Sequence, residues 1–199
     1  RYPESMIASL GREAPLRDRR GRFAVVAHRG GCRTSDDCGA SENSVPVIRL
    51  ARQLGADVIE VDVRMTRDGV PVLYHDDVLT PRLAVGPYCH GSVSDFTLAH
   101  LRALCTLVGG EPIPTLDEAL RAVLDETTLD AVWLDVKVPE AIGPSALAAR
   151  SFDEEASARG RGTHVVLGLG TDALVSAWRE APPAPPVRCL VETSLEDAL

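Results

Sequence analysis

The stretch from Asp57 to Asp76 restricts the fold of this chain more than any other part of it. Its first residues alternate, so that Glu60 and Asp62 point to one face of a strand and the β-branched residues between them point to the other. Two carboxylates on one face of such a strand are unfavourable unless positive charge lies between them. The strand therefore predicts a functional site rather than a plain core.

A tight hairpin is predicted directly after this strand. Asp68-Gly69 is a favoured two-residue loop, because both of its central positions must tolerate positive φ. In that register, residues whose numbers sum to 137 face each other, which places His75 opposite Asp62 on the same face. We therefore expect Glu60, Asp62 and His75 to cluster. The alternative is that the carboxylate and the histidine make a solvated surface contact.

Length and composition fit one globular domain. The chain has 199 residues, of which 45% are hydrophobic and 25% are charged. The net charge of −8 argues against broad nucleic-acid binding. No apolar stretch approaches the roughly 20 residues that span a bilayer. A protein this negative needs local positive charge, from a metal or an arginine, to act on a phosphate group.

The five cysteines favour an oxidising compartment over a zinc site. Cys32 and Cys38 lie in one polar loop, close enough to close a small ring, whereas the other three are scattered and none forms a CxxC pair. The chain begins at Arg1 without a methionine or a signal peptide, as a processed product would. We expect a secreted or cell-envelope protein with one or two disulfides; the cytoplasm is the alternative.

Strands alternate with helices along the chain, after an irregular lead-in over residues 1–22. Strands are expected at 23–27 (buried on both faces), 58–63, 112–114, 132–137, 164–167 and 187–190. Helices are expected at 44–54, 97–104, 115–124, 144–160 and 172–181, with another beginning at 195 and a long loop from the hairpin to about residue 95. This alternation predicts βαβ units and a parallel sheet.

Charged residues recur at the carboxyl ends of these strands. They are His28 and Arg29, Glu60 and Asp62, and Asp135 and Lys137. A (β/α) barrel places its active site at this end. A doubly wound sheet also binds ligands there, but the glycine-rich phosphate loop that it uses is absent after the first strand. We therefore expect a TIM-like (β/α) barrel domain over residues 23–199. Since a closed barrel has eight strands, we expect the last two βα units to be absent from this chain.

A set of short motifs follows in a fixed order between Phe23 and Lys137. They are His28-Arg29-Gly30, Glu42-Asn43, Gly55-Ala56-Asp57 with Glu60-x-Asp62, Thr66-x-Asp68-Gly69, His75-Asp76, Ile113-Pro114-Thr115-Leu116 and Asp135-x-Lys137. In this order and with these spacings, the chain resembles the glycerophosphodiester phosphodiesterases of the PLC-like phosphodiesterase superfamily. The resemblance implies a TIM-like barrel that hydrolyses glycerophosphodiesters to an alcohol and glycerol 3-phosphate with a divalent metal.

The resemblance also implies a role for each residue of the site. The implied ligands of one divalent cation, Ca²⁺ or Mg²⁺, are Glu60, Asp62 and Asp135, with Glu42 as a further candidate. The implied acid–base pair is His28 and His75, and the implied phosphate-binding residues are Arg29 and Lys137. The chemistry agrees, because both cations prefer oxygen ligands and a phosphodiester needs its developing negative charge neutralised.

Two departures from the family pattern leave other functions open. The family usually has Glu at position 135, so that Asp135 could instead form a salt bridge with a lysine. The loop before Glu42 is longer than usual. One alternative function is a phospholipase D-like enzyme that acts on lysophospholipid or sphingomyelin and forms a cyclic phosphate. Another is a module that binds phosphodiesters without turnover. Polar residues at 33, 36 and 37 favour a polar headgroup, and the presence of both histidines favours catalysis.

Overall fold

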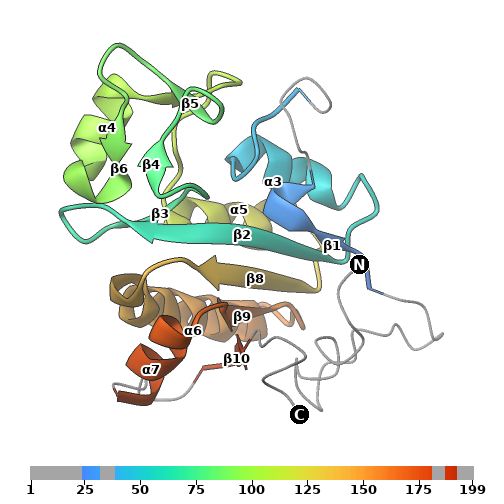
Figure 1. Cartoon of the computed structure of the whole chain (residues 1–199). Coiled ribbons are helices and arrows are strands. Elements are labelled where there is room, and N and C mark those ends of the chain that lie inside the picture. Colours follow the sequence, from blue (N-terminus) through green and yellow to red (C-terminus); the bar gives the residue numbers. More distant parts are fainter. Residues whose placement is uncertain (1–23, 32–38, 181–186, 192–199) are drawn as a thin grey trace.

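Five parallel strands and one short antiparallel strand form the main sheet of the computed structural model, which describes residues 24–31, 39–180 and 187–191 (Figure 1). The parallel strands are β1 (Val26–Ala27), β2 (Val58–Met65), β8 (Ala131–Val136), β9 (His164–Leu169) and β10 (Cys189–Val191). The strands lie side by side in chain order and each adjacent pair is parallel. This is the strand arrangement of a (β/α) barrel, and it confirms the predicted α/β fold class.

One of the six expected parallel strands, at residues 112–114, does not form and does not join this sheet. Pro112 and Pro114 have no backbone N–H and cannot donate to a strand ladder. The segment instead lies antiparallel beside the strand β3 (Pro71–Leu73), where the Leu73 amide donates to the Pro114 carbonyl at 2.9 Å. The predicted lead-in over residues 1–22, the Cys32–Cys38 ring and the helix from residue 195 lie outside the described residues.

Strand β1 is not buried on both faces, contrary to the prediction. Val25 directly before it is 52% exposed and Val26 is half-buried. Within the described residues, β1 pairs with β2 alone and is therefore an edge strand. The predicted helical face is also shorter than expected, because Leu54 lies beyond the end of the helix and is exposed.

Helices cover one face of the sheet. They are α3 (Val45–Ala51), α5 (Leu116–Glu126), α6 (Ile142–Ala158) and α7 (Asp172–Glu180). Ser44 and Thr115 cap the first two as predicted, with side-chain oxygens that accept from Val47 and Glu118 backbone amides. The helices pack on alternate sheet residues to form the main hydrophobic core. No helix of the described ranges has the length and apolar character to cross a membrane.

The opposite face of β2 and β8 is apolar at one end and charged at the other. A small cluster at the amino end contains Val58, Ala131, Trp133, Val166 and Leu190. Farther along the same face come the acidic residues of both strands. Gly168 on β9 has no room for a side chain, because a Cβ there would lie 2.2 Å from the Trp133 indole nitrogen. The sheet thus places its charged residues at the carboxyl end of a packed interior.

The hairpin after β2 forms, but its register differs by one residue from the prediction. Val63 pairs with Leu73 and Met65 with Pro71, so that the residue opposite Asp62 is Tyr74 and not His75. The loop has three residues rather than two, because the Thr66 amide donates to the Val70 carbonyl at 3.1 Å and the Thr66 hydroxyl accepts from the Val70 amide at 2.9 Å. Because neighbouring residues of a strand point to opposite faces, this shift of one residue means that the hairpin does not place His75 opposite Asp62.

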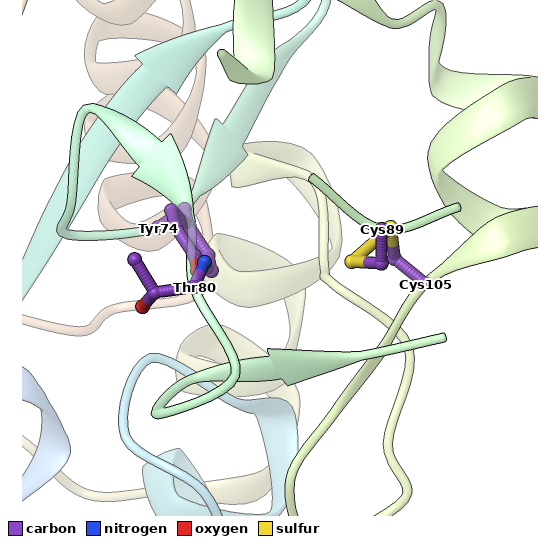
Figure 2. The surroundings of a disulfide bond; sticks show 4 residues. All are labelled: Tyr74, Thr80, Cys89 and Cys105. Atoms are coloured by element: carbon purple, nitrogen blue, oxygen red, sulfur yellow. A yellow bond between two sulfur atoms is a disulfide. The ribbon is translucent and has the colours of Figure 1, made fainter. Parts of the chain in front are cut away.

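Residues 78–113, which we call the insert, fold into a separate small unit beside the β2–β3 hairpin (green in Figure 1). The unit contains β4 (Val78–Leu79), β5 (Ala84–Val85), β6 (Gly91–Ser92), α4 (Leu98–Leu104) and β7 (Thr106–Leu107), where a loop was predicted up to residue 95. A second hydrophobic core lies within the insert, and Val72 and Tyr74 of the main domain also contribute to this core. A disulfide between Cys89 and Cys105 lies in this core (Figure 2).

Candidate active site

Three carboxylates from two neighbouring strands meet at the carboxyl end of the sheet. Parallel pairing of β2 with β8 places Asp62 directly beside Asp135, and Glu60 lies two residues earlier on the same face. One oxygen from each of the three lies within 4.8 Å of the others. Glu60 and Asp62 are buried and Asp135 is half-buried. The structure thus brings together the three residues that were predicted to bind a cation.

Lys137 balances part of this negative charge. It follows β8 directly, and its Nζ lies 2.9 Å from Asp62 Oδ1 and 2.5 Å from Asp135 Oδ2. Burial alone would lower the pKa of Lys137, but the two carboxylates outweigh burial and raise it. The salt bridge that was the alternative for Asp135 is therefore present, and it coexists with the carboxylate group.

The surroundings of Glu60 disfavour its charged form. Burial, followed by the charge of Asp62, raises the pKa of Glu60 to about 8. Its Oε2 accepts from the Arg29 amide at 2.7 Å, whereas its buried Oε1 has no hydrogen-bond partner. A buried carboxylate oxygen without a partner, in an all-oxygen group, is the environment that Ca²⁺ and Mg²⁺ prefer. The three residues therefore fit a divalent cation.

Asn43 fixes the orientation of Asp62, a role that sequence reasoning missed. Its side-chain amide donates to Asp62 Oδ2 at 2.7 Å, and its side-chain oxygen accepts from the Asp62 backbone amide at 3.0 Å. Asn43 has a φ of 57°, which asparagine tolerates better than most residues. The Glu42-Asn43 motif was the signal for this residue, although it gave no indication of the contact.

The turn after β1 carries His28 and Arg29, and the backbone of Arg29 is strained. Arg29 has φ 53° and ψ 30°, which is left-handed for a residue other than glycine. In this conformation its amide reaches Glu60, and its side chain lies 3.2 Å from Glu42 Oε1 and 3.7 Å from Asp62 Oδ2. Gly30 follows with φ 90°, and a Cβ there would lie 2.2 Å from Val47 Cγ1. The turn therefore requires glycine to pack beneath α3.

His28 lies at the edge of the carboxylate group and remains accessible. Its Nε2 is 3.8 Å from Glu60 Oε2, and the ring is more than half exposed. Burial, followed by the charge of Arg29, lowers the pKa of His28 despite the nearby carboxylates. A neutral imidazole can accept a proton, as a general base must.

His75 reaches the site by a route that was not predicted. It lies beyond the end of β3, where the chain has left the hairpin ladder, so that strand pairing does not place it. Buried Arg64 fixes the backbone instead, because its Nε and Nη2 donate to the His75 carbonyl at 2.9 and 2.7 Å. The ring Nδ1 lies 2.7 Å from Asp76 Oδ1. An ionised carboxylate only accepts hydrogen bonds, so Nδ1 carries the proton and Nε2 is left to react.

Glu42 lies outside the carboxylate group and contacts two arginines. Its Oε1 is 3.2 Å from Arg29, and its Oε2 is 3.5 Å from Arg82, a residue that sequence reasoning did not single out. An open cleft of about 730 Å³ is lined by His28, Arg29, Glu42, His75 and Arg82, among others. Both histidines, the predicted phosphate-binding arginine and a second arginine thus line one cavity of a size that suits a small molecule.

Comparisons with known proteins point to one family. Residues 28–165 match the model of the glycerophosphoryl diester phosphodiesterase family. A glycerophosphodiester phosphodiesterase of Caldanaerobacter subterraneus subsp. tengcongensis is 37% identical over 111 residues, which are 53% of this chain and 42% of that protein. The human glycerophosphodiester phosphodiesterase 1 is 36% identical over 126 residues, 59% of this chain and 35% of that protein.

Solved structures show the same fold. A glycerophosphodiester phosphodiesterase from Parabacteroides distasonis superposes with a TM-score of 0.53 at 27% identity, covering 80% of this chain and 61% of that one. A structure from Silicibacter pomeroyi reaches a TM-score of 0.64 at 22% identity, covering 92% of this chain and 68% of that one. The matched region spans less than half the length of the two curated relatives. The family model matches residues 28–165, which are more than half of this chain, and the chain therefore belongs to the glycerophosphoryl diester phosphodiesterase family.

Proposed function

We propose that this chain hydrolyses glycerophosphodiesters to an alcohol and glycerol 3-phosphate in a metal-dependent reaction. One observation carries the proposal: two histidines and Arg29 line a cleft directly beside three clustered carboxylates. Acid–base groups, a phosphate-binding cation and an oxygen-rich metal site are the components that phosphodiester hydrolysis needs. Family membership supports the substrate class.

In this proposal Glu60, Asp62 and Asp135 hold one divalent cation, Ca²⁺ or Mg²⁺. When bound, such a cation supplies positive charge that stabilises a phosphoryl group during reaction. Arg29 binds the non-bridging oxygens, because it lines the cleft and a guanidinium can form two parallel hydrogen bonds with a phosphate. Lys137 contacts both Asp62 and Asp135, and its charge helps to hold these two carboxylates side by side.

The two histidines move the protons. The neighbouring glycerol hydroxyl attacks phosphorus, the bond from phosphorus to the leaving alcohol oxygen breaks, and a cyclic phosphate forms. One histidine accepts the hydroxyl proton, and the other donates a proton to the leaving alcohol. Water then opens the cyclic ester to glycerol 3-phosphate, with the roles of the two histidines exchanged. His28 and His75 serve these two proton-transfer steps.

The test is release of glycerol 3-phosphate from glycerophosphocholine, with EDTA or with added Ca²⁺ or Mg²⁺. We expect release with a divalent cation and none with EDTA. His28→Ala and His75→Ala should each lower kcat by about 10²–10⁴-fold, which is the usual contribution of a proton-transfer group. His100→Ala is the matched control, because His100 is exposed on α4 and contacts no part of the site.

Other outcomes would identify a different function. Accumulation of a cyclic phosphate from lysophospholipid, without release of glycerol 3-phosphate, would replace the proposal with a phospholipase D-like reaction. Binding of glycerophosphocholine without turnover, by folded protein and across several headgroups, would indicate a binding module. The polar residues at 33, 36 and 37 that favoured a polar headgroup lie outside the described residues.

We also propose that the protein works outside the cytoplasm. The support is the disulfide between Cys89 and Cys105 in the core of the insert, since such bonds persist in oxidising compartments. Thiol alkylation of protein extracted from its native cells, without reductant, tests this point. Labelling of both cysteines would contradict it.

A further inference from the structure

Arg82 is a cationic side chain of the cleft to which the function described so far assigns no role. It lies in the insert between β4 and β5, and its side chain is 52% exposed. Its Nη2 is 2.9 Å from Asp76 Oδ1 and its Nη1 is 3.5 Å from Glu42 Oε2. One guanidinium therefore joins two carboxylates that come from different segments of the main domain.

Each of these carboxylates contacts a residue of the proposed reaction. Glu42, which is nearly fully buried, accepts from Arg29 through its other oxygen at 3.2 Å. Asp76 accepts from His75 Nδ1 through the same oxygen that contacts Arg82. Arg82 is thus one step away from the phosphate-binding arginine and one step away from an acid–base histidine.

The contacts of Arg82 favour a supporting role over phosphate binding, because both of its carboxylate partners hold other residues of the site, whereas Arg29 also lies 3.7 Å from Asp62 in the carboxylate group. Two carboxylates already contact its guanidinium. Burial alone would raise the pKa of Asp76, but the hydrogen bond from His75 and the charge of Arg82 outweigh it, and the pKa is lowered. Asp76 therefore stays ionised and keeps accepting from His75 Nδ1.

Other contacts hold Arg82 and its partners in place. The Thr80 hydroxyl donates to Asp76 Oδ2 at 3.2 Å, and the Thr80 amide donates to the buried Tyr74 hydroxyl at 3.1 Å (Figure 2). At the other end of the insert, Glu111 accepts from the Ser41 amide and hydroxyl at 2.9 and 2.8 Å. The insert therefore holds both the segment before β4 and the loop that carries Glu42.

We propose that Arg82 is a positioning residue that holds Arg29, through Glu42, and His75, through Asp76, in one fixed arrangement. The proposal rests on the proposed function for its consequence, since a shifted histidine and a shifted phosphate-binding arginine both slow phosphoryl transfer. A substrate positioned about 1 Å away from its productive geometry can react about 10²-fold more slowly. Arg82 acts through its two carboxylate partners and needs no contact with the reacting atoms.

The test compares Arg82→Ala and Arg82→Lys with Arg102→Ala. Arg102 is a matched control because it lies in the same insert, is half-exposed and pairs with a carboxylate, Glu118, away from the cleft. We expect Arg82→Ala to lower kcat on glycerophosphocholine by about 10- to 100-fold, Arg82→Lys to lower it less, and Arg102→Ala to leave it unchanged. Millimolar guanidinium should partly restore Arg82→Ala, because the free ion can occupy the exposed position between the two carboxylates.

The double variant Arg82→Ala/Asp76→Ala should not respond to guanidinium, because it lacks a carboxylate that holds the ion. Equal kcat for Arg82→Ala and Arg102→Ala would overturn the proposal. So would a loss of activity that neither lysine nor guanidinium relieves and that parallels a lower unfolding temperature, since that pattern indicates a purely structural role.

A second measurement keeps the proposal separate from the proposed function. Wild-type protein should show a slowly exchanging His75 Nδ1 proton in histidine-labelled NMR spectra, and Arg82→Ala should lose it. If the wild type hydrolyses no diester, the proposed function fails while this spectrum still tests the positioning of His75. An unchanged Nδ1 signal in Arg82→Ala would overturn the positioning role whether or not the protein turns over substrate.

Discussion

The two halves of the site are held by different means. The sheet half, Glu60, Asp62, Asp135 and Lys137, is placed by backbone pairing between β2 and β8. The loop half, His75, Asp76 and Arg82, lies where no strand ladder continues and is placed by side-chain hydrogen bonds. Backbone pairing can hold like charges together against their repulsion, whereas side-chain contacts hold groups whose charges already balance. The sheet half therefore carries unbalanced charge, and the loop half depends on the insert.

The largest expected effect is the loss of enzymatic activity when a carboxylate of the sheet half is replaced. Glu60→Gln keeps the shape of the side chain but removes a cation ligand, and we expect glycerol 3-phosphate release to fall by ~10³-fold or more. Glu126→Gln is the control, because this exposed carboxylate pairs with Arg49 away from the cleft. Wild-type turnover by Glu60→Gln at saturating Ca²⁺ or Mg²⁺ would mean that the sheet half holds no catalytic cation.

The same residue predicts a pH dependence of stability that is opposite in sign to that of Asp76 in the loop half, whose pKa is lowered. In EDTA, folded protein has a Glu60 pKa of about 8, against 4.5 for the unfolded chain. The folded state therefore binds more protons between these values, and its free energy of unfolding should fall by about 4 kcal/mol as the pH rises from 4.5 to 8. Urea denaturation at several pH values measures this fall. Glu60→Gln should flatten it, and equal slopes for both proteins would contradict the prediction.

Gly30→Ala tests the turn that supports the sheet half. The new methyl group would meet Val47, and a φ of 90° is unfavourable for alanine, so we expect a loss of about 3 kcal/mol in the free energy of unfolding. Gly143→Ala is the matched control, since a Cβ there meets nothing within 4 Å and its φ is not positive. Urea denaturation that gives the same stability for the two variants would show that α3 moves away easily.

The smallest expected effect is confined to the insert. The disulfide closes a loop with a sequence separation of 16, so replacing both cysteines by serine should cost about 2 kcal/mol. We expect amide hydrogen exchange to become faster in the insert and to stay unchanged in β2, β8 and β9. Cys189→Ser is the control. Equal acceleration in β8 would show that the insert and the sheet unfold as one unit.

The sheet half could be predicted from the sequence because its signals are periodic. Alternation places Glu60 and Asp62 on one face, and Asp135 occurs at the same depth of a second strand, so that adjacent parallel pairing brings them together. The helix caps at Ser44 and Thr115 were equally local and were confirmed. The strand at residues 112–114 was wrong, although its two prolines were a visible warning.

The loop half could not be derived in the same way. The hairpin register depended on the Thr66 hydroxyl, which lengthens the loop by one residue and moves Tyr74 into the position predicted for His75. Arg82 belongs to no periodic pattern, and its partners lie 40 and 6 residues away in the chain. Glu42 was predicted as a candidate ligand from its motif, but its arginine contacts depend on how the insert folds. Tertiary contacts of this kind leave no local signal.

The left-handed conformation of Arg29 has a spectroscopic consequence. It directs the Arg29 amide at Glu60 Oε2, 2.7 Å away, so that a single backbone proton is hydrogen-bonded to the carboxylate with the most perturbed ionisation in the site. Its amide resonance therefore reports on the charge of Glu60 directly, without a label or a substitution. Titration of Ca²⁺ or Mg²⁺ into isotope-labelled protein can be followed at this one signal, separately from turnover.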